Sequence, residues 1–245
     1  MGTSASYHPS LKGKPEWGDL SRNVTSGCNG QDLDNGKLGN IFDKYMKVIG
    51  GVNKASSGRS AVIGRAGIKS ATNLGKFLGS FISSGYNIEQ SLSEIGITDL
   101  STKNLSDIVN HLIEYCSGPA SSIDDKAAKE ATKLLLDEII EKADSIDSFK
   151  LQLEETLKQE TLEEIIIKYF GYYIFEHLSV MFYEKLTKEK GDSKRGKLFK
   201  EIKDFILENL KSVNKTNPLR SLNWGSNKAK ELINKIFKNV LTVFG

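Results

Sequence analysis

The segment 160–187, ETLEEIIIKYFGYYIFEHLSVMFYEKLT, is the most hydrophobic part of the chain and does most to limit its fold. Apolar side chains fall on every side of a helix drawn through it, which is typical of a helix buried at the centre of a domain. Charged residues interrupt the segment, and nowhere does the chain hold about 18 apolar residues in succession, as a transmembrane helix requires. The sequence therefore predicts a central core helix and no membrane-spanning segment.

Apolar residues recur at helical spacing along most of the remaining chain, and no segment alternates as a half-buried strand does. In residues 37–49, for example, Leu38, Ile41, Phe42 and Tyr45 share one face of a helix. Helical segments are expected at 37–49, 59–84, 87–97, 101–116, 117–143, 147–159, 197–213 and 227–243. The prediction is an all-α protein, an irregular helical bundle that comprises residues 37–245.

Residues 1–36 differ from this body because their apolar side chains are isolated and glycine and proline are frequent. No helical or strand period fits them, so we expect a flexible, disordered N-terminal arm. Trp17 is the exception, because a lone tryptophan in such an arm can dock onto the body or onto a partner.

Small residues repeat at spacings of three and four between Gly64 and Gly79, at Gly64, Gly67, Ala71, Gly75 and Gly79. Each glycine lowers helix stability by about 1 kcal/mol relative to alanine, so this many glycines require a packing reason. We expect them to mark the close approach of another helix.

The formal net charge is only +3, which excludes binding of nucleic acid through overall positive charge, yet the charges are unevenly placed. Residues 38–85 hold seven lysines and arginines against one aspartate, and residues 185–240 hold fifteen against six acidic residues. Residues 121–165 hold six lysines against thirteen acidic residues. Two basic blocks therefore flank an acidic block.

Motifs for catalysis or metal binding are not indicated. The two cysteines, Cys28 and Cys116, form no CxxC pair, and the three histidines lie far apart in sequence. Glycines and cations alternate in residues 58–69, but GxxxxGK[ST] is lacking and no strand precedes them. We expect a protein without catalytic or metal-ligating residues. The candidate partner contacts are Trp17, Arg59, Arg65, Lys69 and Trp224.

Several weak motifs in a fixed order carry a family resemblance. The start MGTSAS, then YMKVIGG, then SGRSAVIGRAGIKSATNLGKFLGSF and the stretch that begins GYNIEQSLSEIGITDL together resemble the QatB family of bacterial Qat anti-phage systems. The resemblance covers roughly residues 1–145. It implies a cytoplasmic defence component whose partners are a QatC enzyme similar to QueC, a QatA-like ATPase and a QatD-like nuclease.

The resemblance also gives the N-terminus a role. QueC-like enzymes activate a carboxylated deazapurine with ATP and transfer it to an amine, and in defence systems that amine can be a protein N-terminus. The resemblance therefore implies that Gly2, with Thr3 and Ser4, is the modified and partner-bound segment, which would carry a covalent deazapurine and no other cofactor.

Two other functions stay open on the residues alone. MGTSAS fits the myristoylation pattern, so a membrane-surface adaptor acylated at Gly2 is one alternative to a protein without stable membrane association. A nucleic-acid-binding module that uses the C-terminal basic helices is the other.

Overall fold

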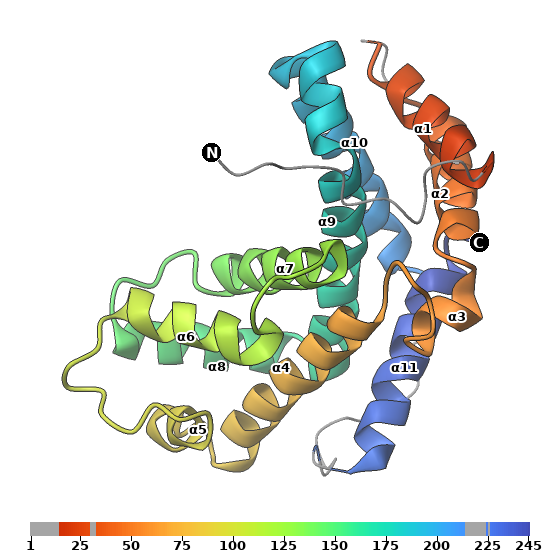
Figure 1. Cartoon of the computed structure of the whole chain (residues 1–245). Coiled ribbons are helices and arrows are strands. Elements are labelled where there is room, and N and C mark those ends of the chain that lie inside the picture. The colour runs from red at the N-terminus through yellow and green to blue at the C-terminus, as the bar shows by residue number, and fades with distance from the viewer. Residues whose placement is uncertain (1–14, 30–32, 214–223, 225) are drawn as a thin grey trace.

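The computed structural model describes residues 15–29, 33–213, 224 and 226–245. These residues form helices and no strand, which confirms the prediction of an irregular all-α bundle (Figure 1). In chain order the helices are α1 (Pro15–Gly27), α2 (Asn35–Val48), α3 (Val52–Ser56), α4 (Arg65–Ser83), α5 (Ile88–Glu94), α6 (Leu105–Ser117), α7 (Ile123–Ile139), α8 (Ile146–Gln159), α9 (Leu162–Lys190), α10 (Asp192–Leu210) and α11 (Asn227–Thr242).

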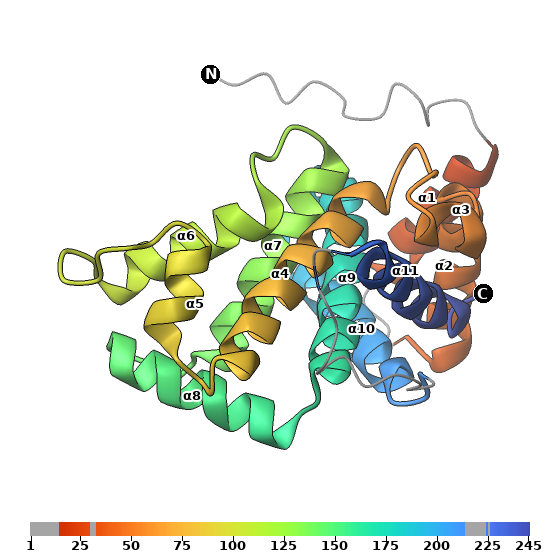
Figure 2. The ribbon, with the colours of Figure 1, turned by 90° about the horizontal axis from the view of Figure 1, so that it is seen from below.

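Helix α9 is the central core helix that the hydrophobic segment predicts. Thr161 and Glu164 form a capping box at its start, and Gly191 ends it with a φ of 78°, a conformation that suits glycine. Helices α1, α4, α7, α10 and α11 all pack on it. Seen from below, α4 and α11 lie in front of α9, with α7 beside α4 (Figure 2).

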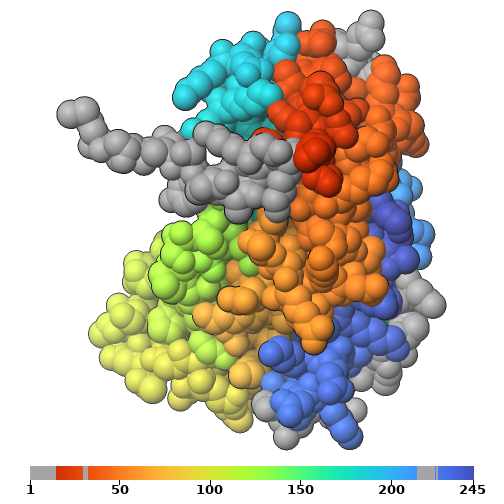
Figure 3. All heavy atoms as spheres, turned by 45° about the vertical axis from the view of Figure 1, so that its right-hand side comes forward, coloured from red at the N-terminus to blue at the C-terminus, as the bar shows by residue number. Residues whose placement is uncertain are grey.

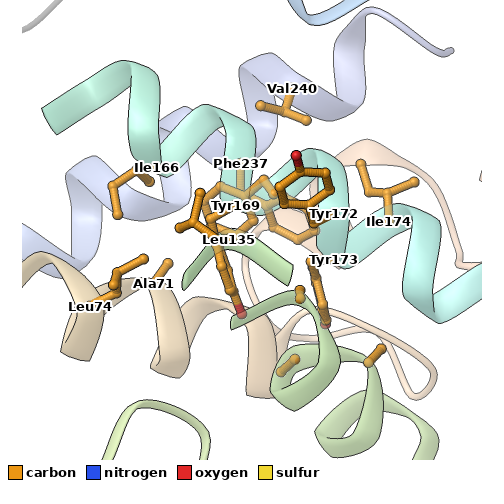
Figure 4. Packing of buried hydrophobic residues seen from close by; sticks show 14 of the residues in the cluster. Ala71, Leu74, Leu135, Ile166, Tyr169, Tyr172, Tyr173, Ile174, Phe237 and Val240 are labelled. Carbon is orange, nitrogen blue, oxygen red and sulfur yellow. The ribbon is translucent and has the colours of Figure 1, made fainter. Parts of the chain in front are cut away.

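Aromatic side chains of α9 fill the centre of the core. Tyr169, Phe170 and Tyr173 are fully buried, and Phe237 of α11 stacks on Phe170 with ring centroids 4.4 Å apart. Leu74 of α4 and Leu135 of α7 also reach this cluster, so one apolar centre joins four helices (Figure 4). Full burial of such a side chain contributes about 1.5–3 kcal/mol.

The arm is shorter than the sequence indicated, because the helical body begins at Pro15 and not at residue 37. Trp17, Leu20 and Val24 lie three and four residues apart on one face of α1, and Leu20 and Val24 are completely buried. The Trp17 ring stacks on Phe182 of α9 at 5.1 Å, so this tryptophan docks onto the body. Proline at the first helical position is favourable, since that N–H has no partner within the helix. The rest of the expected arm, residues 1–14, lies outside the described residues.

The glycines of α4 are packing positions, but aromatic rings approach them and not another backbone. A Cβ built on Gly75 or Gly79 would overlap the indole of Trp224, and one built on Gly67 would overlap the Tyr173 ring. Trp224 is only 9% exposed. The sequence placed Trp224 among the partner contacts; the structure instead gives it a packing role, because the two glycines leave a groove that the indole fills.

In the part of the chain that the structure describes, every helix is too short or too polar to cross a bilayer.

Alanine substitutions at two helical glycines test this packing. Nothing lies within 4 Å of a Cβ at Gly39, so Gly39→Ala gains helix propensity and is expected to stabilise the protein by up to about 1 kcal/mol. Gly75→Ala makes the same local change but is expected to destabilise by about 1–3 kcal/mol, because the new methyl group displaces Trp224. Urea unfolding of both variants measures the difference. Equal effects at the two positions would show that Trp224 does not pack against α4.

Candidate functional site

The connection between α3 and α4, residues 57–64, carries the first of the predicted cations and departs from the sequence expectation. Helix α4 begins at Arg65 and not at residue 59. Gly64 has a φ of 114°, and a Cβ there would overlap the carbonyl oxygen of Ala55. Helix α4 cannot extend towards the N-terminus through this backbone conformation. Residues 57–64 therefore form a loop, hereafter the 57–64 loop.

Asp124 at the start of α7 caps α4 from outside that helix. Its carboxylate oxygens accept hydrogen bonds from the Gly64 N–H at 3.2 Å and the Ala66 N–H at 2.9 Å. A helix leaves its first four N–H groups without partners, and Gly64 has no side chain to cap them. Ser122 is the N-cap of α7 itself, which leaves the Asp124 side chain for α4.

Tyr173 of α9 completes this junction. Its hydroxyl accepts a hydrogen bond from the Gly64 N–H at 2.7 Å and donates one to Asp124. Burial raises the pKa of Asp124, although the hydrogen bonds from Ala66, Tyr173 and Gly64 act to lower it. Burial, with Asp124 nearby, also raises the pKa of Tyr173 well above its usual value. The hydroxyl therefore stays protonated and serves as a donor.

His177, one turn further along α9, holds the same loop. Its Nε2 lies 3.0 Å from the Val62 carbonyl oxygen, which can only accept, so Nε2 is the donor. Its Nδ1 lies 3.0 Å from the hydroxyl of Tyr45 in α2. No sequence motif assigns His177 a chemical role, and the structure shows it fully buried between these two groups.

Hydrogen bonds made by three side chains fix the 57–64 loop to α7, α9 and α2: those of Asp124, Tyr173 and His177. This junction could not be predicted from the sequence, because the three residues are spread over 54 positions and belong to no motif. Gly64 is the one local indication of the junction, because glycine readily adopts the positive φ of 114° that interrupts a helix here.

The predicted cations lie on the outside of this junction. Arg59, Arg65 and Lys69 are all exposed, and none forms an ion pair within residues 15–29, 33–213, 224 and 226–245. Trp17 and Trp224 do not join them, because both rings are packed against the body. Gly2, Thr3 and Ser4 fall outside the described residues.

Glu176 of α9 is a second carboxyl group, after Asp124 of α7, whose surroundings raise its pKa. It is partly buried between α7 and α10, and desolvation raises its pKa to about 7. Glu130 raises this pKa further, whereas Lys203 and Lys126 act to lower it.

A cavity of about 440 Å³ lies between α7, α9 and α10. On its wall Lys168 Nζ lies 2.9 Å from Glu138 and 2.7 Å from Glu160, and Tyr172 donates a hydrogen bond to Glu138. Its polar groups are therefore largely paired with one another.

Removal of the Asp124 carboxylate tests the capping role. Asp124→Ala leaves the Ala66 N–H and the Tyr173 hydroxyl without their acceptor and removes one of the two acceptors of the Gly64 N–H. We expect a loss of about 2–4 kcal/mol in the free energy of unfolding. Asp137→Ala changes an exposed residue of the same helix and should cost less than about 0.5 kcal/mol. Chemical denaturation measures both. A similar small loss at the two positions would remove Asp124 from the junction.

Glu176 predicts a pH-dependent stability. Its pKa is higher in the folded protein than the unfolded value of 4.5, so its favourable contribution is complete below pH 4.5 and is lost as the pH rises through about 7. Glu176→Gln should therefore be more stable than the unsubstituted protein at pH 8, by about 1–2 kcal/mol, and no more stable at pH 4. The control is Glu184→Gln, at an exposed position of α9, which should show no such change between the two pH values. A pH-independent effect of Glu176→Gln contradicts the prediction.

Comparison with known proteins identifies the family. The model of a family described as Qat anti-phage system associated protein QatB matches residues 55–244. No curated protein and no solved structure matches the chain. The match extends past residue 145, where the sequence resemblance ended, and includes the 57–64 loop, α9 and α11; it does not include the first 54 residues. Because it covers more than half of the chain, the chain belongs to the QatB family of Qat anti-phage proteins.

Proposed function

We propose that this protein acts in anti-phage defence without catalysing a reaction, by offering its N-terminal amine to a QueC-like partner of the QatC type. Family membership supports the defence role and makes other Qat components the expected partners. The helical body would then position the N-terminal segment against the partner enzyme.

The observation that carries this proposal is the anchoring of α1 on α9. Trp17 stacks on Phe182, and Ser21 accepts a hydrogen bond from Lys185 at 2.6 Å. Fixing Pro15 to the body limits the reach of the preceding residues, because fourteen residues span at most about 50 Å when fully extended. The partner's active site must therefore lie within that distance of the start of α1.

The use of the buried polar groups supports a non-catalytic body. Asp124, Tyr173 and His177 are the residues that most resemble catalytic groups, and each is engaged with the backbone of residues 62–66. A general base has to release such contacts to reach a substrate proton. These contacts therefore favour a structural use of all three.

Gly2 suits the proposed reaction on chemical grounds. Once Met1 is removed, its α-amine has a pKa of about 8, so a larger fraction is uncharged near neutral pH than for lysine at about 10.4. The carboxylate of a deazapurine would attack the α-phosphorus of ATP on the partner, which would form the acyl adenylate and release pyrophosphate. The amine nitrogen would attack the acyl carbon, an amide would form, AMP would leave and the nitrogen would lose its proton to solvent.

Mass spectrometry of the N-terminal peptide, after co-expression with the QatC-type partner, tests the proposal. The unsubstituted protein should carry the mass of the deazapurine amide on Gly2. Gly2→Ile should abolish the adduct, because a bulky side chain hinders both removal of Met1 and attack by the amine, and the circular dichroism spectrum should stay helical. Gly13→Ile, within the same fourteen residues, is the control and should keep the adduct.

Two results would contradict the proposal. A free Gly2 amine in complexes that still protect cells from phage would show that modification is not required. A myristoyl group on Gly2 would instead identify the membrane-surface adaptor.

A further inference from the structure

The surface over α4 has an unusual charge pattern that the proposed function does not use. From Lys44 to Ile88 the chain contains no aspartate or glutamate, and it contains seven lysines and arginines. Helix α4 lies within this stretch, so its cations have no acidic neighbour along the chain.

One side of α4 forms a continuous polar stripe. Its members lie three or four residues apart and repeat over the whole helix: Arg65, Lys69, Thr72, Lys76, Ser80 and Ser83. Arg65, Lys69 and Ser83 are exposed, and the other three are partly exposed. The stripe therefore presents its cations to solvent along one side of the helix, whereas the Thr72 and Ser83 hydroxyls donate to backbone carbonyl oxygens and the Ser80 hydroxyl oxygen is buried.

Helix α11 packs directly beside α4 and adds to this stripe. Its exposed side carries Lys228, Lys230, Lys235 and Lys238, and Glu231 is its one acidic residue. Packed helices lie about 8–10 Å apart at their contact, so the cations of α4 and α11 belong to two adjoining helices. Figure 2 views α4 and α11 from their outer side, and Figure 3 shows α11 beside the segment that leads from α2 into α4.

The cations of α4 and α11 are not paired with acidic side chains among the described residues. Within the part of the chain that the structure describes, Arg65, Lys69 and Lys76 form no ion pair, and neither do the four lysines of α11. Helix α10, which is also basic, is different: Arg195 pairs with Asp192, and Lys203 lies over the Tyr172 ring at 4.9 Å. The positive potential of α4 and α11 is therefore not neutralised locally.

We propose that α4 and α11 form a cationic face that binds the phosphate backbone of a nucleic acid. The cationic face is defined as Arg65, Lys69 and Lys76 together with Lys228, Lys235 and Lys238. Lysine, arginine, serine and threonine are the side chains that contact phosphate oxygens, and binding of this kind carries no sequence preference.

The composition of the cationic face favours a nucleic acid over an acidic protein. Protein interfaces depend on aromatic and apolar anchors at their centre. The α4 stripe has none, and the large exposed apolar residues of the described chain, Leu151 and Tyr183, lie on α8 and α9. A surface of exposed, unpaired cations without an apolar anchor matches the backbone contacts of a nucleic acid.

Fluorescence anisotropy with the full-length protein and a labelled 30-base-pair DNA of random sequence tests this proposal, with single-stranded DNA and RNA of equal length as further probes. The test variant is Arg65→Gln/Lys69→Gln/Lys235→Gln. The control variant is Lys103→Gln/Lys133→Gln/Lys142→Gln, which removes the same charge from exposed, unpaired lysines away from α4 and α11.

The unsubstituted protein should bind at least one of these nucleic acids, and its affinity should fall steeply as salt is raised. Loss of three phosphate contacts should lower the slope of log affinity against log salt by about 2.7, and at 100 mM salt the test variant should bind at least about tenfold more weakly. The control variant should retain most of the affinity. Because the substituted residues are exposed, both variants should keep the unfolding midpoint of the parent.

Three results would overturn the proposal. One is no binding of any of the three probes at 50 mM salt. The second is equal weakening in the test and control variants, which would reflect net charge alone. The third is displacement of the nucleic acid by polyglutamate of matched charge at equal concentration, which would identify the cationic face as a site for an acidic protein.

Discussion

The contact between Tyr173 and the backbone at Gly64 is the interaction on which the arrangement of helices depends. The Tyr173 ring packs against α4 at Gly67, where there is no side chain to block it. Its hydroxyl accepts a hydrogen bond from the Gly64 N–H and donates one to Asp124. Hydrogen bonds at one buried site therefore join three helices that are distant in sequence, α4, α7 and α9. A larger residue at Gly64 or Gly67 would separate them, because the space that each side chain would need is already occupied.

This junction also determines what the protein can present to solvent. Asp124 neutralises the start of α4 from the inside, while Arg65 and Lys69 of the same first turns point outwards. The acidic partner of α4 is thus buried and used by backbone N–H groups, and the exposed cations keep their positive potential. One buried carboxylate stabilises the helix without cancelling the charge of its outer surface.

The sequence predicted the helical class and the central role of α9 because both follow from apolar spacing, which is a local property. Helix α1 was not predicted from the sequence. Its two buried positions, Leu20 and Val24, are too few to show a helical period in a polar segment that contains glycine, and their burial depends on the position of α9. The sequence indicated the glycines of α4 as packing positions but not their partners. Trp224 and Tyr173 reach those glycines from residues that lie more than 100 positions further along the chain, and no local pattern encodes such a pairing.

The predicted partner contacts fall into two groups. Arg59, Arg65 and Lys69 are exposed and can meet another molecule, whereas the rings of Trp17 and Trp224 pack against the body. Helix α1, which anchors the N-terminal segment, packs mainly on α2 and also on α9, whereas the cationic face belongs to α4 and α11. The two contacts that we propose, of the N-terminal amine with a partner enzyme and of the cationic face with phosphate, would therefore involve different helices. Both could form in one protein, because neither would require a change in the helices that support the other.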